Sequence, residues 1–152
     1  MAGEPEGHLT ARLQKWADGK ATLKDVRGYS NEELYSMARM GYFFYYQGKI
    51  AEARTIFQGL YAVNPADPYF SKALAVVEMA AGNPTGAAAA YDVAIKNFGQ
   101  DPGAYVGRAE VRLSQGQKGP AIDDLRRAQQ LLAAEDPLND KVNALLQALA
   151  RK

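Results

Sequence analysis

The stretch YQGKIAEARTIF, residues 46–57, has two later counterparts in the chain, AAGNPTGAAAAY and SQGQKGPAIDDL. Each of the three stretches is a turn with a central glycine, followed by a run typical of a helix. The glycines Gly48, Gly82 and Gly116 fall 34 residues apart both times. A fixed period of this length is the sequence signature of an architecture built from stacked repeats.

Asp-Pro pairs recur in phase with the glycines, at residues 67–68, 101–102 and 136–137. Each pair predicts a helix start, because Asp accepts hydrogen bonds from the free amides of a first turn and proline is tolerated at the first helical position. Ser30 and Glu33 have the spacing of a capping box and predict an earlier helix start. The unit is therefore helix A, a glycine turn and helix B.

We expect a chain of helices and almost no strands, since no run alternates with period two between turn residues. The stretch HLTARLQKWADG can form one further short helix, and KATLKDVRGY a turn or a second half-helix. The predicted repeat helices span residues 31–47, 50–62, 68–81, 84–98, 102–115, 119–134 and 138–151.

A helix-turn-helix period of 34 residues resembles the tetratricopeptide repeat. The third unit departs most from its pattern, with Arg108 and Arg112 at places that are usually apolar. The resemblance implies an all-α fold, with three tetratricopeptide repeats in a right-handed superhelix between an N-terminal helical segment and a C-terminal capping helix. The first unit matches the pattern at Met37, Met40, Gly41, Phe44, Gly48, Ile50, Ala53, Phe57 and Pro65.

The repeats form one domain, because a single repeat unit cannot bury its apolar face without a neighbouring unit. The last helix fits the role of a cap, since one stripe of it is apolar from Leu138 to Leu149. We expect a single domain over residues 1–152, with an N-terminal segment at 1–30, repeats at 31–67, 68–101 and 102–136, and the capping helix at 137–152.

The chain offers few side chains for chemistry. It has no cysteine, and its one histidine, His8, lies in the N-terminal segment, so no zinc-ligand spacing exists. Asp123 and Asp124, beside Arg126 and Arg127, are expected to form a plain charged helix surface. We therefore predict no enzyme activity, no cofactor and no metal site.

Charge and hydropathy limit the partners and the compartment. A net charge of +1 without a basic patch argues against nucleic acid as a partner. The longest apolar stretch, ALAVVEMAAG, falls short of the roughly 20 residues of a membrane span, so we expect no membrane partner. The N-terminus MAGEPEGHLT lacks the basic and apolar regions of a secretory signal, which predicts a cytoplasmic protein.

Tyrosines gather on the first helix A, in the stretch LYSMARMGYFFYY. At 3.6 residues per turn, Leu34, Met37, Gly41 and Phe44 form one stripe, which we expect to pack on helix B. The other stripe would line the concave groove of a repeat stack. Tyrosine suits a peptide-binding groove, because it offers a large contact area and a hydrogen-bonding tip. The alternative is that the rings pack against the N-terminal segment or the neighbouring repeat. The predicted groove residues are Tyr35, Tyr42, Tyr45, Tyr46, Tyr69, Lys72, Val76 and Met79.

Three such units behind one or two short helices resemble the class II chaperones of bacterial type III secretion, which bind translocator proteins. The segments ATLKD, ELYSMA, YYQGKIAEA and IFQGL carry this resemblance. It implies a bacterial, cytoplasmic chaperone that holds an extended, apolar N-terminal segment of a translocator in its groove. The family's dimerisation through N-terminal helices implies a homodimer interface at Leu9, Leu13 and Trp16, although these residues also fit a simple helical cap. The alternative function is a generic scaffold in a multiprotein complex.

Overall fold

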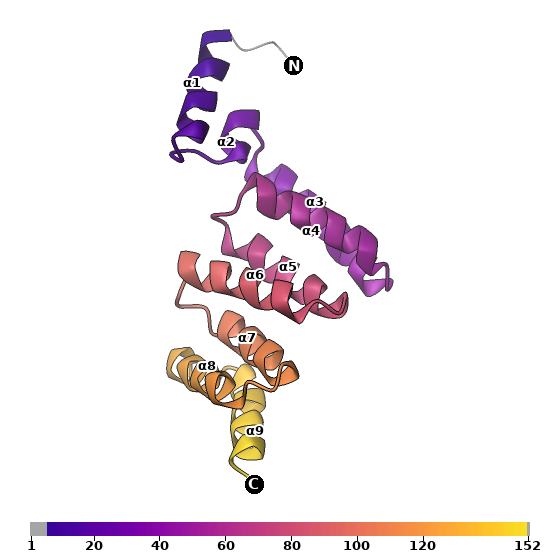
Figure 1. Ribbon diagram of the computed structural model, residues 1–152, viewed down its shortest axis with the longest axis vertical. Coiled ribbons are helices and arrows are strands. Elements are labelled where there is room, and N and C mark those ends of the chain that lie inside the picture. Colours follow the sequence, from indigo (N-terminus) through magenta and orange to yellow (C-terminus); the bar gives the residue numbers. More distant parts are fainter. Residues whose placement is uncertain (1–5, 152) are drawn as a thin grey trace.

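The computed structural model describes residues 6–151, and within this range the chain forms nine α-helices and no strand. The helices follow one another along the long axis of the molecule, with α1 at one end and α9 at the other (Figure 1). They are α1 (Glu6–Ala17), α2 (Leu23–Arg27), α3 (Asn31–Tyr46), α4 (Ile50–Val63), α5 (Pro68–Ala80), α6 (Pro84–Asn97), α7 (Pro102–Ser114), α8 (Lys118–Leu131) and α9 (Leu138–Ala150).

The predicted all-α repeat fold is confirmed, with α3, α5 and α7 as helices A and α4, α6 and α8 as helices B. The largest difference from the expected bounds is at α8, which ends at Leu131, three residues before the expected end. From α3 to α9, consecutive helices pack on one another, and α9 closes the stack against α8. This places the three helices A in neighbouring positions along one side of the stack.

Side-chain caps begin the helices A where the sequence predicts them. The Glu33 amide donates to Ser30 Oγ at 3.1 Å, and the Ser30 amide donates to Glu33 Oε2 at 2.8 Å, which completes the capping box. Asp67 and Asp101 cap α5 and α7, each by accepting a hydrogen bond of 2.9 Å from an amide two residues on. Asp136 accepts in the same way from the Leu138 amide at 2.9 Å, but α9 begins at Leu138 rather than at the preceding proline.

Helices A and B of the first repeat cross closely at a glycine. A Cβ on Gly41 would lie 2.8 Å from two ring carbons of Phe57, a residue with no exposed surface. The same need for a small residue recurs at Ala75 and Ala109, which are fully buried in the next two helices A. Contacts this close remove apolar surface from water and fix the angle between the helices.

A buried charge cluster accompanies the apolar core of the third repeat. The Asp124 carboxylate is 3% exposed, and it accepts hydrogen bonds from Arg108 at 2.7 and 3.0 Å and from Arg112 at 2.7 Å. Arg108 also pairs with Asp92 of the second repeat at 2.8 Å. The expectation that Asp124 lies on a solvent surface is therefore wrong, because a buried carboxylate needs charged partners and the two arginines of α7 supply them.

Replacing Gly41 by alanine is expected to destabilise the protein, whereas the same change at Gly59 is expected to stabilise it. Overpacking against Phe57 costs about 1–3 kcal/mol and outweighs the gain of about 1 kcal/mol from higher helix propensity. Gly59 also lies inside a helix, but a Cβ there meets nothing within 4 Å. Urea unfolding of both variants measures the difference, and equal stabilisation at the two positions would contradict the close crossing.

Asp124→Asn is expected to lower the free energy of unfolding by about 3 kcal/mol, because it leaves two arginines facing a neutral side chain in a buried site. Its neighbour Asp123 is exposed, so Asp123→Asn serves as the matched control and should change stability by less than about 0.5 kcal/mol. Thermal unfolding followed by circular dichroism compares the two. Similar melting temperatures for both variants would show that the cluster contributes little.

Candidate functional site

Four of the predicted groove residues, Tyr35, Tyr42, Tyr46 and Tyr69, form a continuous set of rings on α3 and α5, which we call the tyrosine cluster. The centroids of Tyr35 and Tyr69 lie 5.3 Å apart, with the rings edge to face. Tyr42 lies 6.3 Å from both Tyr69 and Tyr46. Such geometries are the ones that aromatic pairs prefer, so the rings support one another across the border between the first two repeats.

Exposure differs widely within the tyrosine cluster. Tyr46 is 80% exposed, and Tyr35 and Tyr69 keep more than a third of their surface in water. Tyr42 is half-buried, and its ring packs 5.0 Å from Phe57 in the core. Burial, followed by interaction with Tyr69, raises the pKa of Tyr42 well above its usual range. Tyr42 thus belongs to the packed interior as well as to the surface, whereas most of the Tyr46 side chain is exposed to solvent.

Two of the predicted groove side chains bond to the cap of the next helix A. The Tyr35 hydroxyl donates to Asp67 Oδ2 at 2.7 Å, which raises the pKa of the Tyr35 phenol. Lys72 Nζ lies 2.5 Å from Asp101 Oδ2. Each aspartate uses its other oxygen to cap its own helix. Lys72 is therefore already paired. Asp67 and Asp101, which bind these two side chains, also stabilise the starts of α5 and α7.

The remaining predicted groove residues, Tyr45, Val76 and Met79, line a hollow between the three helices A, which we call the central hollow. Its volume is about 300 Å³, and its other lining residues are Ala80, Tyr91, Gly107, Glu110 and Val111. Val76 and Met79 stand on α5, between Tyr45 of α3 and the α7 residues. The hollow is therefore mostly apolar, with one carboxylate among its lining groups.

Tyr91 and Gly107 belong to this hollow but are absent from the predicted set. Tyr91 is buried on α6, and burial, followed by the nearby Glu110, raises its pKa to about 12. A Cβ on Gly107 would lie 2.3 Å from the end of the Tyr91 ring, so only glycine leaves room for this ring. A glycine inside a predicted helix is the signal that would have indicated such a close approach.

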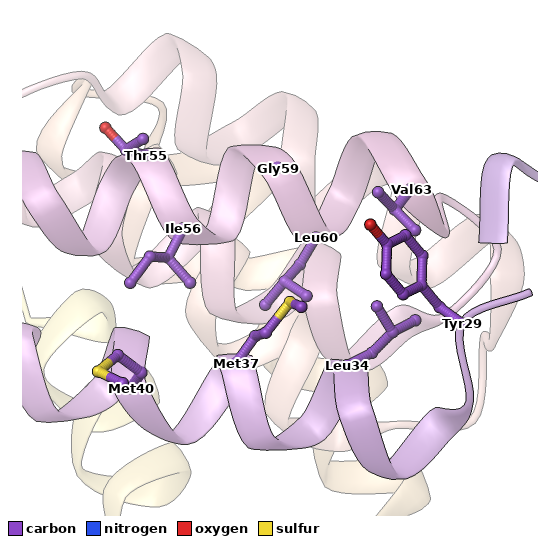
Figure 2. A pocket seen from close by; sticks show the side chains of 9 residues that line it. All are labelled: Tyr29, Leu34, Met37, Met40, Thr55, Ile56, Gly59, Leu60 and Val63. Carbon is purple, nitrogen blue, oxygen red and sulfur yellow. The ribbon is translucent and has the colours of Figure 1, made fainter. Parts of the chain in front are cut away.

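A second apolar pocket, which we call the end pocket, lies between α3 and α4 on the side away from α5. The sequence did not predict it. Figure 2 shows the side chains of Met37, Ile56 and Leu60 directed into the space between the two helices. The volume is about 330 Å³, and the full lining is Tyr29, Leu34, Met37, Met40, Thr55, Ile56, Gly59, Leu60 and Val63.

Met37 was expected to pack on helix B, but it and Met40 remain 45% and 54% exposed. The physical reason is their place at the end of the stack, where no earlier repeat covers the first helix pair. Of the predicted dimer residues, Leu13 and Trp16 on α1 are also about half exposed. The side chain of Leu9 lies outside the described part of the chain.

Two searches of the described residues bear on other functions. Among residues 6–151, no group of three or more His, Cys, Asp or Glu side chains lies in an arrangement that could hold a metal ion. No helix in the same part of the chain has the length and apolar character needed to cross a membrane.

Comparison with known proteins gives one family and a set of similar structures. The model of the tetratricopeptide repeat family matches residues 38–102. No curated protein matches the chain. The fold agrees with a type III secretion complex from Aeromonas hydrophila, at a TM-score of 0.80 and 28% identity over 95% of each chain.

Two structures of the type III secretion translocator chaperone SycD from Yersinia enterocolitica are also similar. The first has a TM-score of 0.78 and 25% identity, over 84% of this chain and 98% of SycD. The second is SycD in complex with a peptide of the translocator YopD, with a TM-score of 0.74 and 24% identity over 79% and 94%. At that identity, the second likeness shows the fold alone.

The described part of the chain has the fold of tetratricopeptide-repeat proteins, and residues 38–102 match that family's repeat pattern. Within that class it resembles the class II chaperones of type III secretion, as the segments around the first repeat predict.

Tyr35→Phe is expected to lower the free energy of unfolding by about 1 kcal/mol, because it removes the hydrogen bond to Asp67 and leaves the ring in place. Tyr46→Phe is the control, since the Tyr46 ring is the most exposed of the cluster and should lose less than about 0.5 kcal/mol. The denaturant midpoints of the two variants measure this difference in stability. Equal midpoints would show that the Tyr35 hydroxyl contributes nothing across the repeat border.

Proposed function

We propose that the protein is a non-enzymatic, peptide-binding chaperone of a type III secretion system in the bacterial cytoplasm. Its client is a translocator protein, whose apolar N-terminal segment lies extended along the helices A. The observation that carries the proposal is the continuity of the tyrosine cluster with the central hollow, since the Tyr46 ring lies 5.4 Å from Tyr45, which lines the hollow. The complex of SycD with a YopD peptide supports the assignment for a protein of the same fold.

The exposed tyrosines suit an extended segment with apolar side chains. Tyr46 and Tyr69 present ring faces and hydroxyl groups together, so they can cover apolar groups and donate hydrogen bonds to a peptide backbone. Tyrosine also loses little conformational entropy when it is fixed by a partner, because it has only two side-chain torsions. The tyrosine cluster would therefore hold the client at a small ordering cost.

The central hollow gives the same face a place for an anchor side chain. Its volume of about 300 Å³ suits one aliphatic side chain of the client, in contact with Val76, Met79 and the edge of Tyr91. Burial of such a side chain contributes about 1.5–3 kcal/mol. An aggregation-prone client would then be kept from self-association by occupation of one apolar segment, without ATP.

The test is capture of partners from the native host by the tagged protein, with identification by mass spectrometry. Wild type is compared with the double variant Tyr46→Ala, Tyr69→Ala and with Val76→Arg, which fills the hollow with a charge. We expect one partner with long apolar segments, held at least 10-fold more weakly by either variant, since anchor residues contribute about 2 kcal/mol each on truncation. Tyr42 is left unchanged because its ring packs on Phe57.

Phe98→Ala is the matched control, since Phe98 is also about half exposed but lies outside both parts of the site. Circular dichroism checks that each variant keeps its helical content. A partner that all variants retain equally would contradict the proposed face, and would favour the alternative of a scaffold that binds through other surfaces.

A further inference from the structure

We propose that the end pocket holds a second anchor side chain of the same client. The client's apolar segment leaves the tyrosine cluster, crosses the exposed side of α3 and enters this pocket. The inference rests on the proposed function, because it extends the path of the client beyond the helix A face to a pocket on the other side of α3.

Exposed apolar side chains form a continuous row on α3 between the two sites. Residues three apart are neighbours on a helix surface, and each such step turns by about 60° around the axis. The row therefore winds around α3, from the end pocket to the tyrosine cluster. Exposure increases along it from 45% to 80%. Its members are Met37, Met40, Phe43 and Tyr46.

Phe43 is the member of this row that joins the two sites. It lies between Met40 of the end pocket and Tyr46 of the tyrosine cluster. Its ring is 6.0 Å from the Phe44 ring, yet the residue remains 57% exposed. Single exposed apolar side chains are common, but an unbroken row of large ones marks a binding surface.

Arg39 offers hydrogen bonds to a chain that crosses here. It lies one turn before Phe43 on α3, and its Nη2 donates to Ser36 Oγ at 2.6 Å. Within residues 6–151, no carboxylate forms an ion pair with Arg39. A guanidinium has five N–H donors, so several are left for acceptors of a partner. An extended chain presents free carbonyl oxygens at such a point, whereas the carbonyls inside a helix are already bonded.

The end pocket has the size and lining for one large apolar side chain. Its volume is about 330 Å³, and Figure 2 shows Met37 beside the open space. Gly59 lines the pocket, although glycine inside a helix is disfavoured relative to alanine. At Gly41 and Gly107 a buried ring needs the room, but nothing lies within 4 Å of a Cβ on Gly59. The space at Gly59 is therefore open to a group from outside the chain.

The length of the crossing sets the spacing of the client's anchors. Met40 and Tyr46 are separated by about 9 Å along the axis of α3, and a helix with its side chains is about 10–12 Å wide. A path over its surface is thus about 20 Å long, which an extended chain spans with about six residues. The client should carry two apolar anchors about six to ten residues apart, one for each side of α3.

The experiment is photo-cross-linking of the full chain in its native host. The photoreactive amino acid p-benzoylphenylalanine replaces Met40 in the end pocket, Tyr69 on the helix A face, or Phe98, which is exposed outside both sites. Mass spectrometry identifies the attached protein and the attached residue. We expect the first two positions to attach to one protein, at residues about six to ten apart in its sequence. The Phe98 position should not attach to that protein.

Gly59→Leu tests the pocket itself, because it fills the space without a clash inside the chain. We expect it to reduce the Met40 product at least 10-fold, while most of the Tyr69 product remains. Gly119→Leu is the matched control on α8, where a Cβ also meets nothing within 4 Å, and should keep both products. Circular dichroism checks that both variants keep their helical content.

The outcomes separate this inference from the proposed function. The Met40 position could attach to a second copy of this chain, to an unrelated protein, to a distant part of the client, or to nothing. Each of these results overturns the inference but leaves the proposed function intact, as long as the Tyr69 position attaches to the client. A Met40 product that Gly59→Leu leaves unchanged overturns it too. If the Tyr69 position attaches to no protein with long apolar segments, the proposed function fails and this inference fails with it.

Discussion

The close crossing of helices A and B is the constraint on which the other features of the structure depend. At Gly41 the ring of Phe57 occupies the place of a side chain, and at Gly107 the end of Tyr91 does the same. Because small residues stand at these crossings, the large side chains of the helices A are directed to the remaining faces. The tyrosine cluster on one face follows from this geometry, whereas the end pocket is open because no earlier repeat covers the first helix pair.

The third repeat adds a cluster of charges to this packing. Arg108 and Arg112 occupy positions that are usually apolar, and the stack tolerates them because Asp124 accepts hydrogen bonds from both. The bond from Arg108 to Asp92 extends the cluster into the second repeat. Specific pairing therefore supplements apolar contact in the third repeat, where Val106 and Leu125 belong to a buried core with Val142 of α9.

Most of the fold was predictable from the sequence, because its signals are local. The glycines and the Asp-Pro pairs affect the backbone within one turn of their own positions, so they predict where the turns lie and where the helices start. The burial of Asp124 was not predictable in this way, since its partners lie 12 and 16 residues away on another helix. Helical periodicity places the tyrosines on one face. It does not predict that Tyr42 is packed and Tyr46 exposed, because this difference depends on the position of the Phe57 ring in the core.

Asp67 and Asp101 connect the surface of one repeat to the start of the next. Each aspartate holds a helix cap with one oxygen and a side chain of the preceding repeat, Tyr35 or Lys72, with the other. In a linear array, coupling between neighbours decides whether units melt singly or together. These shared carboxylates are such couplings, and they bind side chains of the helix A face, Tyr35 and Lys72. A partner bound to that face would therefore change how cooperatively the repeats melt.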